Sequence, residues 1–134
     1  MNKNFEKRPL NYHPLVLIVD NDCDNLLFAS CVIESLGMNY VVTDNSEECL
    51  GLVYEFLPDL ILLDIVMPKL NGLEITRIIK QDSKIAHIPV IAVTGLTHDE
   101  DKGRLIEAGF DGYISKPYLI EELEHKVCSY IKHP

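Results

Sequence analysis

The stretch Leu60–Asp64, with the sequence Leu-Ile-Leu-Leu-Asp, decides the fold of this chain, because it is a continuous apolar run that ends in a carboxylate. A run without polar alternation is typical of a strand that is covered on both faces of a sheet. The run Leu15–Val19 is of the same kind and is also followed by an aspartate, Asp20. Shorter runs predict three further strands, at Asn39–Thr43, Ile88–Val93 and Gly112–Ile114.

Helical patterns fill the intervals between these strands. Apolar residues recur at helical spacing in four segments, Leu26–Leu36, Cys49–Phe56, Ile75–Ile79 and Leu119–Ile131. Gly37 has the position of a helix stop, and Gly109 ends a fifth helical segment. Five strand–helix units in series predict an α/β fold, a doubly wound five-stranded parallel sheet with five helices on both faces. In such a sheet, ligands bind beyond the carboxyl ends of the strands.

Size and charge exclude several classes of protein. A chain of 134 residues suits one domain. With 47% hydrophobic and 25% charged residues it has a globular and not a disordered composition. A net charge of −9 disfavours direct contact with nucleic acid or with acidic membrane surfaces. No apolar run is long enough to span a bilayer. We therefore predict a cytoplasmic protein with a short N-terminal tail over residues 1–13 and one domain over residues 14–134.

The cysteines and histidines do not form a recognisable metal or disulfide pattern. The cysteines lack CxxC spacing, so we interpret them as small core residues or partly exposed thiols in a reducing compartment. The histidines contain no pair with the spacing of metal ligands, and we interpret them as surface residues. The residues concerned are Cys23, Cys31, Cys49, Cys128, His13, His87, His98, His125 and His133.

Polar side chains that could carry chemistry follow four of the predicted strands, at Asp20, Asp64, Thr94 and Lys116. Each one alone is more simply a helix cap, a turn former or a surface lysine. Together they describe a reaction site, because carboxylates that lie close together need a cation and Mg²⁺ prefers oxygen ligands. A carboxylate can attack phosphorus, and a metal, an ammonium and a hydroxyl can stabilise the charge on a transferring phosphoryl group.

The sequence resembles the receiver domain of two-component response regulators, over about residues 14 to 132. The segments that carry the resemblance are Leu17–Asp20, Pro58–Pro68 with Asn71-Gly72, Ile88–Thr94 and Gly109–Pro117. The resemblance implies the strand order 2-1-3-4-5. It also implies a stand-alone, chemotaxis-regulator-like protein in which no output domain follows and the signal leaves through protein contact.

By this resemblance, Asp64 is the phosphoacceptor. Asp20 belongs to an acidic pair that serves Mg²⁺, and Val66 gives its backbone carbonyl to the metal. Thr94 is the switch hydroxyl, and Lys116 contacts the phosphoryl group. The chemistry implied is self-phosphorylation from a donor and self-dephosphorylation, which leaves open whether to class the protein as an enzyme.

Several positions have two readings. Tyr113 falls at the aromatic switch position of the family, but it also fits a half-buried strand residue whose hydroxyl has a partner. Asp22 reads better as the N-cap of the first helix than as a metal ligand. Gly72 reads as a turn or helix-start residue. The Lys116–Pro117 bond is commonly cis in this family, although cis is a minority state of X–Pro bonds in general.

Two features depart from the family pattern. Asn21 stands where the second acidic metal ligand is expected. An amide oxygen can coordinate Mg²⁺ but brings no charge, so we predict weakened affinity. The residues two positions after Asp64 and Thr94 are Val66 and Leu96. Neither apolar side chain can orient a water by hydrogen bonding, so we predict a long-lived phosphoryl group.

The resemblance implies a sensor histidine kinase or a histidine phosphotransfer protein upstream and an unidentified protein effector downstream. A homodimer through the fourth-helix face is left open. The main alternative function is a pseudo-receiver, a phosphorylation-independent binding module, and Asn21 is its best support. A small phosphohydrolase or nucleotide binder is a third reading, but no Gly-rich phosphate loop follows the first strand.

Overall fold

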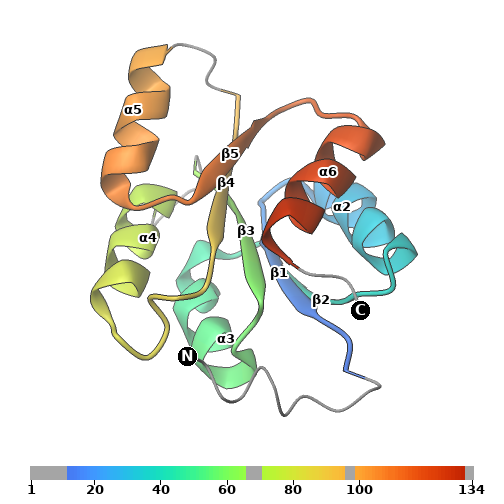
Figure 1. The fold of residues 1–134 in the computed structure, drawn as a ribbon, viewed down its shortest axis with the longest axis horizontal. Helices are drawn as coiled ribbons and strands as arrows, with labels where there is room; N and C mark the ends of the chain where they lie inside the picture. Colours follow the sequence, from blue (N-terminus) through green and yellow to red (C-terminus); the bar gives the residue numbers. More distant parts are fainter. Residues whose placement is uncertain (1–11, 66–70, 96–98, 132–134) are drawn as a thin grey trace.

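A computed structural model describes residues 12–65, 71–95 and 99–131, without the side chains of residues 99–101. The described strands form one parallel sheet in the order β2-β1-β3-β4-β5, which confirms the predicted fold class and strand order (Figure 1). These strands are β1 (Leu15–Val19), β2 (Asn39–Thr43), β3 (Leu60–Asp64), β4 (Val90–Thr94) and β5 (Gly112–Ser115).

Helices cover both faces of the sheet, with α2 and α6 on one side and α3, α4 and α5 on the other (Figure 1). Their bounds are α2 (Cys23–Ser35), η1 (Ser46–Glu48), α3 (Cys49–Phe56), α4 (Gly72–Gln81), α5 (Asp99–Ala108) and α6 (Ile120–Tyr130). The short 3₁₀ helix η1 was not predicted from the sequence. Within the described residues, no helix is both long and apolar enough to cross a bilayer.

The core consists of two layers that the sheet separates. Leu17 and Leu63 point to the layer that holds α3, α4 and α5, whereas Ile18 and Leu62 point to the layer that holds α2 and α6. Every residue of β3 and β4 is buried. This is why these strands read as unbroken apolar runs, since alternation appears only when one face of a strand meets water.

Local signals set several of the helix ends as predicted. The Asp22 side chain accepts hydrogen bonds from the backbone N–H groups of Asp24 and Asn25 at the start of α2, which confirms its reading as an N-cap. Gly37 and Gly109 follow α2 and α5 with φ of 76° and 104°, a conformation that glycine adopts at little cost.

Other expectations were wrong in detail. The fourth strand begins at Val90 and not at Ile88. The preceding Pro89 has no N–H to give to a ladder, although its carbonyl accepts from Ile61. Leu119 is 65% exposed because it is the N-cap of α6 and not part of its buried face. Phe56 and Ile78 also lie on helical apolar patterns but are exposed.

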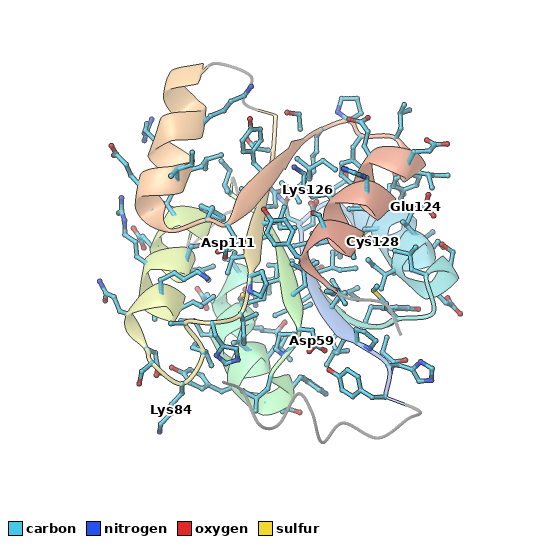
Figure 2. The ribbon with its side chains drawn as sticks, viewed as in Figure 1. Asp59, Lys84, Asp111, Glu124, Lys126 and Cys128 are labelled. Carbon is cyan, nitrogen blue, oxygen red and sulfur yellow. The ribbon has the colours of Figure 1, made fainter. Side chains whose placement is uncertain are left out.

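The cysteines and the described histidines agree with the prediction from the sequence. All four cysteines are free thiols; Cys49 is buried and the other three are exposed. His13, His87 and His125 are exposed, whereas His98 and His133 lie outside the described residues. Tyr12, near the end of the predicted tail, donates a hydrogen bond to Asp59, which Figure 2 labels. The tail over residues 1–13 stays a prediction, because residues 1–11 are not described.

Candidate functional site

Three of the predicted site residues lie together at the carboxyl edge of the sheet. Asp20 directly follows β1, and Asp64 and Thr94 are the last residues of β3 and β4. All three are buried, and Asp20 and Asp64 are only 1% and 6% exposed. Neighbouring parallel strands end at one edge, which brings together residues that are far apart in the chain.

Lys116 joins the two carboxylates. Its Nζ lies 2.7 Å from Oδ2 of Asp20 and 3.3 Å from Oδ2 of Asp64. Its backbone N–H donates to the carbonyl of Thr94 at 2.7 Å, and the bond to Pro117 is cis, as expected. The four residues that the sequence placed at strand ends therefore form one cluster.

The charge of Lys116 follows from its surroundings. Burial by itself lowers the pKa of the Lys116 ammonium, but the hydrogen bond to Asp20 and the charges of Asp64 and Asp20 raise it by more. The net effect is a raised pKa, so the lysine stays protonated at neutral pH. A fixed cation therefore compensates two buried carboxylates that would otherwise repel each other.

Asp20 has further partners that the sequence reasoning missed. Its Oδ1 accepts the backbone N–H of Asp22 at 2.9 Å. Its Oδ2 accepts from Nδ2 of Asn25 at 2.5 Å, and this is the same oxygen that contacts Lys116. The sequence offered one signal for Asn25, which is a polar residue in the first turn of the helix after an acidic strand end. Polar residues are common at helix starts, so this signal did not set Asn25 apart.

The donor set suits Mg²⁺ in type but is short of charge. Two carboxylates at one edge are hard oxygen ligands of the kind that Mg²⁺ takes together with several waters. Asn21 is exposed, and Asp22 is engaged as a helix cap. In the described part of the chain, no group of three or more His, Cys, Asp or Glu side chains is placed to hold a metal. Val66 and Leu96 lie outside the described residues, so their predicted roles remain predictions.

Tyr113 lies on β5, opposite Ala92 of β4, and is half-buried. Its ring packs against the core layer beneath α5. The ammonium groups of Lys102 on α5 and Lys126 on α6 lie 5.3 Å and 5.8 Å from the ring centroid. An open pocket of about 280 Å³ adjoins the ring and is lined by Tyr113, Ile114, Ser115, Glu122, His125 and Lys126. The ring therefore contacts both the core and two cations.

The start of α4 lies close against the end of β3. Gly72 is the first residue of α4, which confirms its reading as a helix-start residue. A Cβ atom at Gly72 would meet the Cα of Ile65 at 2.8 Å and the carbonyl oxygen of Asp64 at 3.1 Å. A close backbone approach beside Asp64 is a second reason for glycine here, and the sequence analysis did not find it.

Comparison with known proteins identifies the family. The family model described as response regulator receiver domain matches residues 16–128. The chain belongs to this family. The polar-differentiation response regulator DivK of Brucella anthropi is 38% identical over 117 residues, which cover 87% of this chain and 94% of that protein.

Solved receiver structures share the fold. The chemotaxis response regulator CheY4 of Vibrio cholerae superposes with a TM-score of 0.85 at 22% identity, over 90% of this chain and 100% of that one. The receiver domain of the sensor histidine kinase PA1611 from Pseudomonas aeruginosa, described with a magnesium ion coordinated in its active-site cleft, gives a TM-score of 0.80 at 24% identity, over 89% and 98%. At these identities the two structures support the receiver fold only.

Proposed function

We propose that this receiver accepts a phosphoryl group on Asp64 from a phosphohistidine donor, with Mg²⁺, and acts as a stand-alone regulator through phosphorylation-dependent protein contact. The observation that carries the proposal is the contact of Lys116 with the buried carboxylates of both Asp20 and Asp64. An acceptor carboxylate, a second carboxylate for a cation and an ammonium beside them are the groups that phosphoryl transfer needs.

In the proposed reaction, a carboxylate oxygen of Asp64 attacks phosphorus. The donor phosphohistidine carries a proton on its other ring nitrogen. The new P–O bond forms as its P–N bond breaks, the bonding pair stays on nitrogen, and a neutral imidazole leaves. Asp20, Asp64 and the backbone carbonyl of Val66 would hold Mg²⁺, with Asn21 as a weakened ligand, and the bound ion supplies positive charge to the phosphoryl oxygens. Lys116 turns from the carboxylates towards the phosphoryl group, and the hydroxyl of Thr94 is drawn to it.

The output of this switch would be a change in the face formed by α5, β5 and α6. Movement of Thr94 opens space for Tyr113 to turn inward, which alters the surface beside Lys126 and the adjoining pocket. A protein effector that prefers the altered surface shifts the equilibrium towards it and, by linkage, favours phosphorylation. The upstream partner is a sensor histidine kinase or a histidine phosphotransfer protein, and a homodimer through this face is one form the output could take.

The test is intact-mass spectrometry after incubation with Mg²⁺ and acetyl phosphate. We expect a single phosphoryl adduct on the wild type and none on Asp64→Asn. Asp44→Asn is the matched control, since Asp44 is an exposed aspartate that follows β2 in the same sheet. No adduct on the wild type at high Mg²⁺ would contradict the proposal and favour the phosphorylation-independent binding module.

A second test concerns the missing acidic ligand. Asn21→Asp adds a carboxylate next to Asp20, and a unit charge about 4 Å from the ion contributes on the order of 1–4 kcal/mol at solvent-exposed sites. We therefore expect tighter Mg²⁺ binding, by about tenfold if the gain is about 1.4 kcal/mol. Isothermal titration calorimetry of both proteins checks this, and equal affinities would show that Asn21 does not limit the metal site.

A further inference from the structure

Asn25 contacts one of the two carboxylates of the candidate site. It is a half-buried residue in the first turn of α2, and its Nδ2 donates to Oδ2 of Asp20 at 2.5 Å. Lys116 contacts this same oxygen at 2.7 Å. Oδ1 of Asp20 accepts the backbone N–H of Asp22. The orientation of the Asp20 carboxylate is therefore defined by one cation and two N–H donors.

The polar contacts of Asn25 continue into the candidate site. They run from Asn25 to Asp20, and from there through Lys116 to Asp64.

We propose that Asn25 is a positioning residue that keeps the Asp20 carboxylate oriented for the cation when Lys116 turns to the phosphoryl group. This inference rests on the proposed phosphoacceptor function. It extends that function to a side chain that contacts neither the phosphoryl group nor the acceptor.

The physical need for such a residue follows from the burial of Asp20. A buried carboxylate that loses its ammonium partner is costly unless hydrogen bonds satisfy it. The amide of Asn25 is uncharged and does not compete with a cation for the site, so it can stay bound while Lys116 leaves. With Asn21 in place of an acid, the residue next to Asp20 brings no second negative charge, so the metal site depends more strongly on the orientation of Asp20.

The experiment measures binding of Mg²⁺ alone to unphosphorylated protein by isothermal titration calorimetry. Residues that orient a metal ligand typically contribute about 10–100-fold to metal affinity. We expect Asn25→Leu, which removes the donor at similar volume, to weaken Mg²⁺ binding by about tenfold or more. Asn25→Gln, which keeps an amide donor, should recover part of this loss. Asn39→Leu is the matched control, since Asn39 is an exposed asparagine at the start of β2.

The outcomes distinguish failure of this inference from failure of the proposed phosphoacceptor function on which it rests. A wild type that is phosphorylated on Asp64, with an Asn25→Leu variant that folds and binds Mg²⁺ as tightly as the wild type, overturns the positioning role and leaves the phosphoacceptor function standing. A wild type that acquires no phosphoryl group overturns the function itself. If Asn25→Leu does not fold, Asn25→Ala and Asn25→Gln provide the same comparison.

Discussion

At the scale of single residues, burial decides which of four chemically identical thiols is inert. Cys49 begins α3 and is 0% exposed, in contact with the core layer that α4 and α5 also cover. Burial raises the pKa of this thiol to about 12. The thiolate is the reactive form, so a buried thiol with a raised pKa reacts slowly.

We expect three of the four thiols to react with Ellman's reagent in the native protein at pH 8. These are the exposed Cys23, Cys31 and Cys128. The fourth should react only after unfolding, so the absorbance should rise again by one thiol in denaturant. A native Cys49→Ala variant should show the same three fast thiols and no further rise. Four fast thiols in the native wild type would contradict this.

The raised pKa of Cys49 also predicts a loss of stability in alkali. The folded thiol ionises near pH 12, whereas an unfolded cysteine ionises near 9.0. Below pH 9 the thiol is protonated in both states and its ionisation does not affect stability. As the pH rises from 9 towards 12, only the unfolded thiol ionises, so the free energy of unfolding falls by up to about 1.4 kcal/mol per pH unit. Urea unfolding between pH 8 and 10.5 should show a steeper fall for the wild type than for Cys49→Ala. Parallel curves would show that Cys49 does not contribute.

At the scale of elements, the start of α4 and the end of β3 are in such close contact that a methyl group cannot enter. Gly72→Ala would place its Cβ against the backbone of Ile65 and the carbonyl of Asp64. We expect this variant to lose about 1–3 kcal/mol of unfolding free energy, as overpacked sites do. Because the displaced backbone carries Asp64, phosphorylation from acetyl phosphate should also slow.

Gly51 supplies the matched control, since it lies in α3 and a Cβ there meets nothing within 4 Å. Gly51→Ala should raise the unfolding free energy by about 0.5–1 kcal/mol, because alanine loses less entropy in a helix than glycine. Both values come from urea unfolding. A Gly72→Ala variant as stable and as readily phosphorylated as the wild type would refute the close-contact argument.

A lysine at the end of α4 connects this helix to the loop before β4 and to the turn before β5. Nζ of Lys80 donates to the carbonyls of Ala86 and Ile88 and to Oδ2 of Asp111, at 3.1, 2.9 and 2.8 Å. The same Asp111 oxygen accepts the backbone N–H of Val90 at 2.8 Å. One ammonium group therefore satisfies two backbone carbonyls and one carboxylate at the amino edge of the sheet.

We expect Lys80→Met to lower the unfolding free energy by about 1–3 kcal/mol, because these acceptors lose their donor. Lys84→Met is the control. Lys84 is exposed in the loop after α4, and Figure 2 shows its side chain directed away from the body of the protein. Its effect should stay within about 0.5 kcal/mol. Equal losses for both variants in urea unfolding would mean that the Lys80 contacts add nothing.

At the scale of the whole molecule, the proposed switch couples the site to a face built by α5, β5 and α6. Lys126, which Figure 2 labels on α6, has its ammonium 5.8 Å from the centroid of the Tyr113 ring. A contact of this kind contributes about 0.5–1 kcal/mol at exposed sites. It stabilises the present position of the ring against the inward position that the switch requires.

Lys126→Met should therefore ease phosphorylation, because a ring that is held less firmly lowers the cost of the phosphorylated state. A change of about 0.5–1 kcal/mol corresponds to an approximately two- to fivefold lower acetyl phosphate concentration for half-maximal modification of Asp64. Intact-mass spectra over a donor series measure this, with Lys84→Met as the charge control. An unchanged or higher half-maximal concentration would argue against the coupling.

Much of this fold is determined locally. Strands covered on both faces must be apolar throughout, so β1, β3 and β4 were visible as runs, and the caps at Asp22, Gly37 and Gly109 were visible as residue types. The burial of Phe56, Ile78 and Leu119 was predicted less well, because all three are exposed. These apolar residues recur at helical spacing, but whether a neighbouring element covers a given side chain depends on how the helices pack and end.

The α/β class, the order of the strand-end residues and the types of group at the site all followed from the amino-acid sequence. The packing of the folded chain sets three other features: Lys116 contacts both Asp20 and Asp64, Asn25 extends this series of contacts, and Gly72 has no room for a side chain. Strand runs and helix caps depend on neighbours within a few residues. The contact of Lys116 with Asp64 joins residues 52 positions apart, and the packing of the whole sheet and its helices sets that distance.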